Sequence, residues 1–303
     1  MQNLVTAQEM KAADNRTSEQ FGMESLVLME RAALSAKAVL AEYLQTKTKF
    51  LFFCGVGNNG GDGLALARIL FLEKKLVQVI MVGDPTRCTP SCKRQLQIVK
   101  AYGVPVCTGE NLPGDEEIKE KINSAEVIVD ALLGVGVNRL IGEPMNRIIQ
   151  AINRRPEKTW CVSLDLPTGI HTDTGEVLGM AVRADLTITF AFQKLGLIRF
   201  PGCEFAGRVI LADAGITQES LADSVHVTYT AKEIEEKIPK RKAYGNKGTF
   251  GKVLVIAGSH DMAGAALLCA RGAYGVGAGM VKIVTDASNR LDRKSTRLNS
   301  SHM

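Results

Sequence analysis

One stretch of the chain, residues 50–65, constrains the fold more strongly than any other. It reads FLFFCGVGNNGGDGLA, in which an apolar, aromatic-rich run gives way to five glycines within nine residues and then to helix-forming residues. This pattern predicts a buried strand, a tight turn and the start of a helix. Because a helix start presents backbone N–H groups and the positive end of the helix dipole, the stretch is typical of an anion site, most often a phosphate site.

The glycine spacing G-x-G-x-x-G that begins at Gly55 is that of a dinucleotide-binding fingerprint. However, Asn58, Asn59 and Asp62 add two carboxamides and a carboxylate, which a simple phosphate loop does not need. The loop is therefore predicted to hold another group besides phosphate. The alternative is that Asp62 only caps the helix predicted over residues 62–73.

Strand and helix patterns alternate along the rest of the first 215 residues, which predicts parallel βαβ units. We expect a Rossmann-like, doubly wound sheet in a three-layer α/β/α arrangement. Two helices should precede the sheet, and the first has a capping box at its N-terminus. The expected helices are residues 7–21, 24–43, 62–73, 90–102 and 115–122, and the strands that follow the opening one are residues 77–82, 104–107, 127–132, 159–164, 186–190 and, at an edge, 208–212.

Three polar loops follow strands of this sheet: NNGGD at residues 58–62, GVGVNR at 134–139 and DLPTG at 165–169. Ligands of doubly wound sheets bind at the carboxyl ends of the strands. We therefore expect these loops to converge on one crevice.

Asp130 and Asp165 lie near the ends of otherwise apolar strands. A buried carboxylate is costly unless it is paired or bound to a cation. Two carboxylates, an asparagine and a hydroxyl would suit a cation with oxygen ligands, and Arg139 would suit a phosphate. Asp130 could instead cap a neighbouring loop.

Five segments, GNNGGDG, VDALLGVGVNR, SLDLPTGI, ADLTITF and FQKLGL, together resemble the N-terminal domain of the YjeF family, the NAD(P)H-hydrate epimerases, in order and spacing. The resemblance covers roughly residues 7–215. It implies a Rossmann-like domain that interconverts the R and S epimers of hydrated NADH and NADPH (NADHX and NADPHX), a damaged form of the cofactor.

The resemblance also implies a set of site residues. Potassium would be the cofactor, held by Asn59, Asp130 and Thr168, where Thr168 replaces the serine of many members. Asp165 would reach the reacting ring, and we expect it to act as acid and base. The substrate-binding residues implied are Asn58, Asn59, Gly60, Gly61, Asp62, Gly134, Val135, Gly136, Val137, Asn138, Arg139, Leu140 and Asp165.

The last third of the chain has a different character. The epimerase domain is predicted over residues 1–220 and a linker over 221–240. The segment KGTFGKVLVIAGS resembles the opening of the ribokinase-like, ADP- or ATP-dependent dehydratase domain that is fused to the epimerase in bifunctional members. We expect residues 241–290 to be a truncated start of that domain without dehydratase activity, and residues 291–303 to be a non-native tail.

The composition excludes several classes of protein. The net charge of +5 comes from interspersed charges, so no nucleic-acid footprint is expected, and no segment is apolar enough to predict a membrane span. Seven scattered cysteines and the lack of a secretory signal predict a cytoplasmic protein with reduced thiols. The two leading helices offer a surface for a homodimer.

Two alternatives stay open. The first is an NAD-dependent oxidoreductase, in which Asp84 would bind a ribose about 20 residues after the fingerprint. The second is a non-enzymatic protein-binding module of the same fold. Retention of Asn59, Asp130, Asp165 and Thr168 together argues against this second class.

Overall fold

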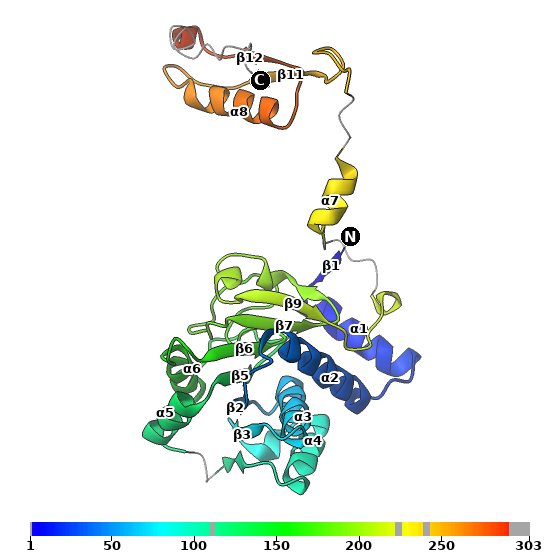
Figure 1. Cartoon of the computed structure of the whole chain (residues 1–303), viewed down its shortest axis with the longest axis vertical. Coiled ribbons are helices and arrows are strands. Elements are labelled where there is room, and N and C mark those ends of the chain that lie inside the picture. Colours follow the sequence, from blue (N-terminus) through cyan, green and yellow to red (C-terminus); the bar gives the residue numbers. More distant parts are fainter. Residues whose placement is uncertain (1, 110–112, 222–225, 239–242, 291–303) are drawn as a thin grey trace. The chain divides into compact units, whose positions relative to one another are not determined.

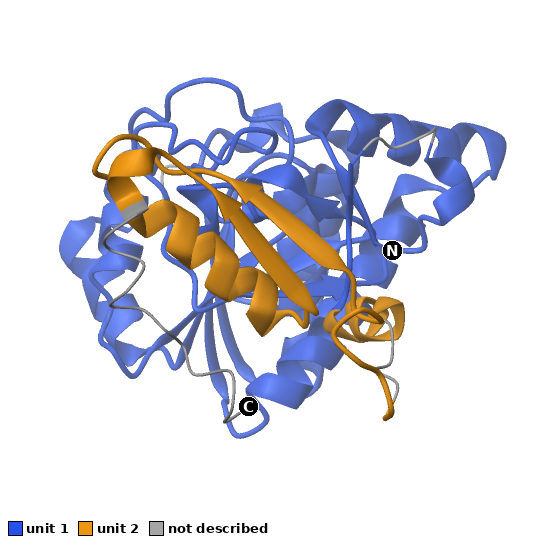
Figure 2. Ribbon diagram, turned by 90° about the horizontal axis from the view of Figure 1, so that it is seen from above, with its two compact units in different colours: residues 1–230 blue, residues 231–303 orange. Residues whose placement is uncertain are grey.

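The structure is a computed structural model that describes residues 2–109, 113–221, 226–238 and 243–290. The chain forms two compact units, residues Met1–Thr230 and Ala231–Met303 (Figure 2). The segment predicted as a non-native tail, 291–303, lies outside the described residues.

A parallel sheet of seven strands organises the first unit (Figure 1). Its spatial order is β4-β3-β2-β5-β6-β7-β9, so the order reverses between β2 and β5, which is the switch point of a doubly wound fold. The predicted fold class is thus confirmed, and β9 is the predicted edge strand. The bounds are β2 (Lys49–Cys54), β3 (Leu76–Met81), β4 (Val106–Cys107), β5 (Val127–Ala131), β6 (Trp160–Leu164), β7 (Leu186–Phe190) and β9 (Arg208–Ala212).

Helices cover both faces of this sheet. Side chains of α2 (Ser25–Tyr43), α3 (Asn58–Leu72) and α4 (Pro90–Ala101) share one buried cluster with Phe52 of β2. Those of α5 (Asp115–Ser124) and α6 (Met145–Asn153) share another with Phe53. Because neighbouring residues of a strand point to opposite faces, the continuous apolar run of β2 serves both layers.

A second, three-stranded sheet joins distant parts of the first unit. Its order is β10-β1-β8, with β1 (Gln2–Val5) antiparallel to β10 (His226–Thr228) and parallel to β8 (Gln193–Lys194). The strand β10 lies inside the segment predicted as a linker, 221–240, and belongs to the first compact unit. After β1, helix α1 (Ala7–Gln20) begins at the predicted capping box, in which Thr6 and Glu9 bond each other's backbone N–H groups.

Helix α3 begins four residues earlier than predicted. Its N-cap is Gly57, so the segment 58–62 forms the first turns of the helix instead of a loop, and the alternative that Asp62 caps the helix is wrong. The glycines allow close packing here: a Cβ at Gly60 would collide with the carbonyl oxygen of Gly55. Glycine disfavours helix by about 1 kcal/mol, so tertiary packing overrides the local preference.

The second unit is small. Its parallel strands β11 (Lys252–Ile256) and β12 (Met280–Val284) are connected through α8 (Gly264–Gly275), which makes one βαβ unit preceded by α7 (Ala231–Lys237). Short 3-10 turns complete the described chain: η1 (Pro85–Arg87), η3 (Leu195–Leu197), η4 (Gly202–Glu204), η5 (Gln218–Ser220) and η6 (Ala287–Arg290). None of the described helices combines the length and hydrophobicity that crossing a bilayer requires.

Candidate active site

The N-terminus of α3 lies at the switch point, directly after β2. The N-cap residue is Gly57, so no side chain caps the first N–H groups of the helix. A Cβ built on Gly57 would meet no atom within 4 Å. Asn58 is turned to α4 and accepts a hydrogen bond of 2.7 Å from the hydroxyl of Thr89. The helix therefore presents backbone N–H groups to an open space, which is the arrangement that binds anions.

Residues of the three polar segments meet next to this helix start. A Cβ on Gly134 would lie 3.1 Å from Cβ of Asn59 and 3.1 Å from Oδ2 of Asp165. The backbone N–H of Val135 donates to the same Oδ2 over 3.3 Å. The structure thus brings together residues that are more than a hundred positions apart in the chain.

Asp130 and Thr168 form a buried pair beneath this meeting point. Thr168 donates to Asp130 through its hydroxyl, at 2.6 Å, and through its backbone N–H, at 2.9 Å. The hydroxyl of Ser163 and the backbone N–H of Leu132 add 2.8 and 3.3 Å bonds. Burial raises the pKa of Asp130, and the hydrogen bonds counteract part of that shift. Asp130 therefore holds the 165–169 turn in place through Thr168. This is the contact expected if Asp130 caps a neighbouring loop.

Asn59 is the residue whose chemistry points to a missing partner. The residue is 8% exposed, and neither its amide oxygen nor its amide nitrogen has a hydrogen-bond partner among the described residues. A buried unsatisfied amide is unfavourable by about 1–3 kcal/mol. An amide oxygen, a hydroxyl and one carboxylate are oxygen donors of the kind that hard cations bind, so the implied set Asn59, Asp130 and Thr168 fits a potassium ion. The described part of the chain holds no group of three His, Cys, Asp or Glu residues that could form another metal site.

Lys194 is a site residue that the sequence analysis missed. Its side chain is 1% exposed, and its ammonium group forms an ion pair with Asp165. The ammonium also donates to the hydroxyl of Thr189, at 3.1 Å, and to the carbonyl of Phe190, at 2.9 Å. The only sign in the sequence is a lone lysine in the apolar segment FQKLGL, directly after the strand at 186–190.

Two further carboxyl groups act on this ion pair. Asp62 is half-buried in α3, and burial, with the negative charges of Asp165 and Asp14, raises its pKa well above the ordinary value. Water reaches Asp14, yet desolvation by surrounding protein atoms raises its pKa to about 6, against the lowering effect of Lys194. Asp14 was not predicted, because nothing in the sequence links helix α1 to the three loops.

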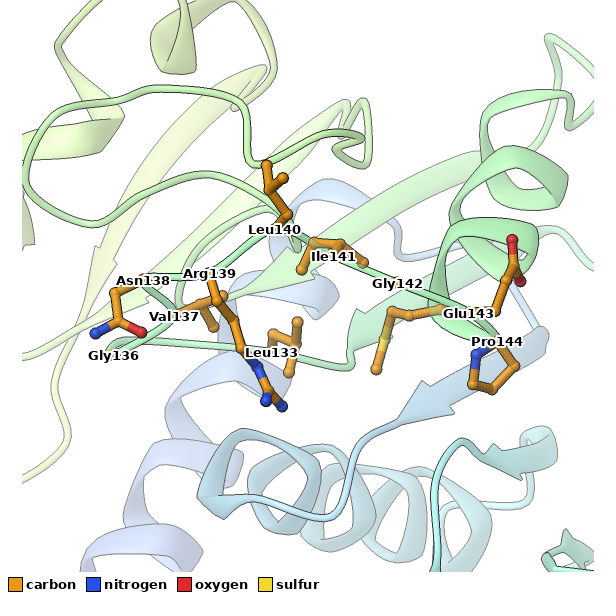
Figure 3. A pocket seen from close by; sticks show the side chains of 11 residues that line it. Leu133, Gly136, Val137, Asn138, Arg139, Leu140, Ile141, Gly142, Glu143 and Pro144 are labelled. Atoms are coloured by element: carbon orange, nitrogen blue, oxygen red, sulfur yellow. The ribbon is translucent and has the colours of Figure 1, made fainter.

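The segment after Gly134 lines a pocket of about 510 Å3 (Figure 3). Leu133 contributes to its wall and also donates a 3.1 Å backbone hydrogen bond to the hydroxyl of Thr168, so the pocket adjoins the buried pair. The predicted binding segment therefore splits in two: Gly134 and Val135 contact Asp165, while its later residues line the pocket. The lining residues are Leu133, Gly136, Val137, Asn138, Arg139, Leu140, Ile141, Gly142, Glu143, Pro144 and Met145.

The sequence of the chain matches two known protein families. A sequence profile described as YjeF-related protein N-terminus matches residues 25–196. The chain belongs to this family. A second profile, described as NAD(P)H-hydrate dehydratase, matches residues 253–300.

Two kinds of relative match the chain: longer bifunctional enzymes and shorter epimerases. The bifunctional NAD(P)H-hydrate repair enzyme Nnr of Thermofilum pendens is 34% identical over 91% of this chain, which spans 52% of that relative. The NAD(P)H-hydrate epimerases of Limosilactobacillus fermentum and Leuconostoc mesenteroides are 37% and 39% identical, and the matches cover 69% and 71% of this chain and 95% and 92% of those relatives. The chain thus spans about half the length of the bifunctional relative and nearly all of the epimerases.

The YjeF fold is also seen in a crystal structure of the yeast protein ynu0. It aligns with a TM-score of 0.62 over 76% of this chain and 98% of the yeast chain, at 22% sequence identity. This similarity supports the fold alone.

Within this YjeF-family domain, Asp84, the acid that an oxidoreductase would use to bind a ribose, has a local structural role. It caps η1, where it accepts bonds of 2.9 and 2.7 Å from the backbone N–H and the hydroxyl of Thr86. These bonds lower the pKa of Asp84. Asp84 therefore stabilises the turn that follows β3.

Proposed function

We propose that the chain is an NAD(P)H-hydrate epimerase, which interconverts the R and S forms of NADHX and NADPHX. The position of Asp165 carries this proposal: its carboxylate contacts Gly134 and Val135 close to Asn59, beside the uncapped start of α3. Chemistry on the nicotinamide ring of a dinucleotide needs a proton-transfer group near a pyrophosphate site. The two relatives that the chain covers almost completely are named as epimerases of this substrate.

The substrate would be held by two features. The N–H groups at the start of α3 suit the pyrophosphate. Arg139, which is exposed on the loop that lines the pocket, supplies a second positive charge. Gly136 to Leu140 would then surround the remainder of the dinucleotide, in accordance with the substrate-binding role implied for them.

The reaction at C6 follows from the chemistry of the substrate. The hydroxyl on C6 is adjacent to a ring nitrogen, whose lone pair can expel it once the hydroxyl is protonated. The C–O bond breaks, water leaves, and a planar iminium ion remains; water then returns to either face and gives up one proton. Asp165 is the group we assign to this proton transfer, which by general acid–base catalysis contributes a factor of about 10²–10⁴.

A potassium ion would be held by Asn59, Asp130 and Thr168. When bound, it would supply positive charge next to the phosphates and the buried carboxylate. The unpartnered amide of Asn59 supports this assignment, because a cation would take up its oxygen.

We further propose that these 303 residues do not dehydrate NAD(P)HX. In the second unit the described elements comprise a single βαβ unit after α7, whereas the bifunctional relatives are about twice as long as the matched chain. For the compartment we propose the cytoplasm, which agrees with seven cysteines that are all free thiols.

The epimerase assignment is tested with the separated R epimer and the purified chain. Chromatography of the two epimers over time should show conversion to the S form far faster than in buffer, and faster in potassium than in sodium chloride of equal strength. Conversion at the uncatalysed rate in both salts would contradict the assignment. Conversion that is equally fast in both salts would contradict the potassium assignment and leave the epimerase assignment standing.

A further inference from the structure

Lys194 is a buried cation that joins the end of β7 to Asp165 of the candidate site. It lies in β8 with 1% of its side chain exposed, and it bonds the carboxylate of Asp165, the hydroxyl of Thr189 and the carbonyl of Phe190. Three acceptors satisfy the three N–H bonds of an ammonium group. The cation thus has one orientation.

Asp165 is restrained from several directions. Its backbone has φ +70, a conformation that residues other than glycine rarely adopt, and its N–H donates a 2.7 Å bond to the carbonyl of Ile188. In the side chain, Oδ1 takes the ion pair with Lys194 and Oδ2 takes the N–H of Val135 at 3.3 Å. An unusual backbone conformation that the surroundings maintain is often found at functional sites.

The strand that carries Lys194 is itself held in register. Val5 of β1 is paired with Lys194, and Leu4 with Gln193. Strand β1 is in turn paired with β10. The position of the ammonium group therefore depends on the small sheet as well as on the loop that it contacts.

We propose that Lys194 is a positioning residue of the active site, which fixes the orientation of the Asp165 carboxylate. This inference rests on the proposed epimerase function and adds to it. With Lys194 as its partner, the carboxylate that exchanges the proton at C6 is held in one position. The charged groups facing this pair are Asp14 of α1 and Asp62 of α3.

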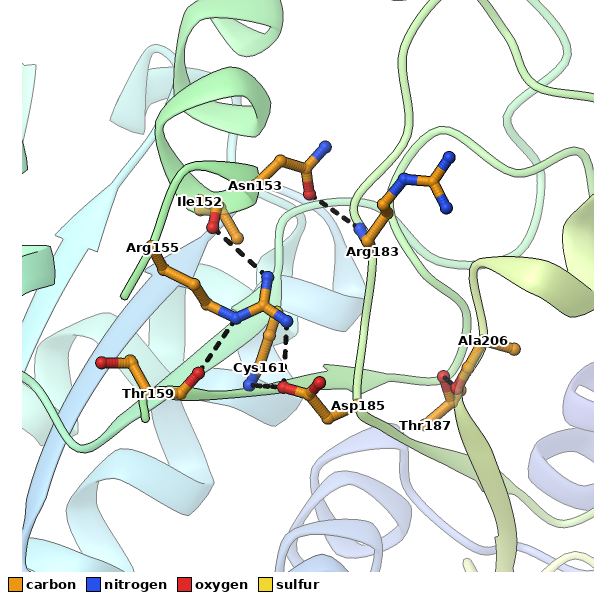
Figure 4. A network of polar contacts seen from close by, with 9 residues as sticks. All are labelled: Ile152, Asn153, Arg155, Thr159, Cys161, Arg183, Asp185, Thr187 and Ala206. Atoms are coloured by element: carbon orange, nitrogen blue, oxygen red, sulfur yellow. Dashed lines mark hydrogen bonds and ion pairs between the residues drawn. The ribbon is translucent and has the colours of Figure 1, made fainter. Parts of the chain in front are cut away.

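The test compares Lys194→Met with Arg155→Met, a matched control at the other end of the sheet. Arg155 is also a mostly buried cation: it forms a 2.9 Å ion pair with Asp185, which precedes β7, and bonds the carbonyls of Ile152 and Thr159 (Figure 4). Both substitutions remove a cation that is paired with an aspartate. Only Lys194→Met should affect Asp165.

We expect Lys194→Met to lower kcat by about 100-fold, the effect of a misplaced catalytic group, with KM changed less than about 3-fold. Lys194→Arg, which keeps the charge, should recover part of the lost kcat. Arg155→Met should lower Tm and leave the kcat of the folded enzyme unchanged.

A double-mutant cycle completes the test. In an Asp165→Asn background, adding Lys194→Met should lower the residual rate by less than about 3-fold, because the lysine acts through Asp165. A wild-type kcat in Lys194→Met, or a full second loss in the double mutant, would overturn the inference while the epimerase function stands. An inactive wild-type chain would instead overturn the proposed function, and this inference with it.

Discussion

The buried amide of Asn59 destabilises the ligand-free protein but would favour the binding of a cation. Both polar atoms of its amide are buried without a partner, so the ligand-free protein carries an unfavourable group that a bound cation would relieve. Asn59→Leu should therefore raise the free energy of unfolding by about 1 kcal/mol in buffer without potassium. The same variant should lose the rise in Tm that we expect potassium to cause in the wild type. Thermal melts of both proteins in sodium and potassium chloride measure this, and an equal potassium shift in both would contradict the assigned ligand.

Asp14 gives a pH dependence whose sign is fixed by its environment. Its pKa is about 6 in the folded chain against an ordinary value of 3.8, so its contribution to stability is full below pH 3.8 and is lost as the pH rises through about 6. Because the side chain in Asp14→Asn cannot ionise, the variant does not lose this stability as the pH rises. Because water reaches Asp14, we expect the variant to gain no more than about 1 kcal/mol at pH 8 and nothing at pH 4. Urea unfolding at the two pH values checks this; a larger gain at pH 4 than at pH 8 would contradict it.

The sequence could predict some site residues and not others. Asp130 lies near the end of one apolar strand, Asp165 and Thr168 follow another, and the parallel topology alone places these strand ends at one edge. Lys194 could not be assigned a partner, since its ion pair with Asp165 spans 29 residues. Asp14 is coupled to the site only through the three-dimensional position of α1, so no local pattern identifies it.

At the scale of elements, strands were easier to predict than the start of α3. The apolar runs of β2 and β5 are long enough to define buried strands. The helix start was misplaced because glycines at 60, 61 and 63 disfavour helix in isolation, whereas tight packing of Gly60 on Gly55 and of Gly63 on Ala131 favours it in the fold. Strand β10 was missed because it has three residues in a polar segment.

Strand β10 leads to a prediction about domain limits. It is paired with β1, which is paired in turn with the strand that carries Lys194. A chain of residues 1–221 should therefore melt several degrees below a chain of residues 1–230, since each kcal/mol lost lowers Tm by about 2–4 °C at this size. Its kcat should also be lower. Equal Tm and kcat for the two chains, by calorimetry and the epimer assay, would show that β10 has no part in the first unit.

At the scale of the whole molecule, the second unit leaves apolar side chains exposed. Ile256, Leu268 and Val276 are 76%, 69% and 90% exposed, and two strands with one helix cannot cover both faces of a sheet. Removal of residues 231–303 should reduce self-association at rising concentration, measured by light scattering, and leave kcat unchanged. A drop in kcat would contradict this expectation and show that the second unit contributes to the reaction.

The central claim is that the carboxylate of Asp165 carries out proton transfer in the epimerisation of NAD(P)HX. The most direct measurement is the rate of R-to-S conversion, followed by chromatography, for the wild type, for Asp165→Asn and for Asp84→Asn as a control aspartate that only caps a turn. We predict that Asp165→Asn loses about 10²–10⁴ in kcat, while Asp84→Asn keeps the wild-type kcat and KM. Conversion by Asp165→Asn within a few-fold of the wild-type rate would contradict the account.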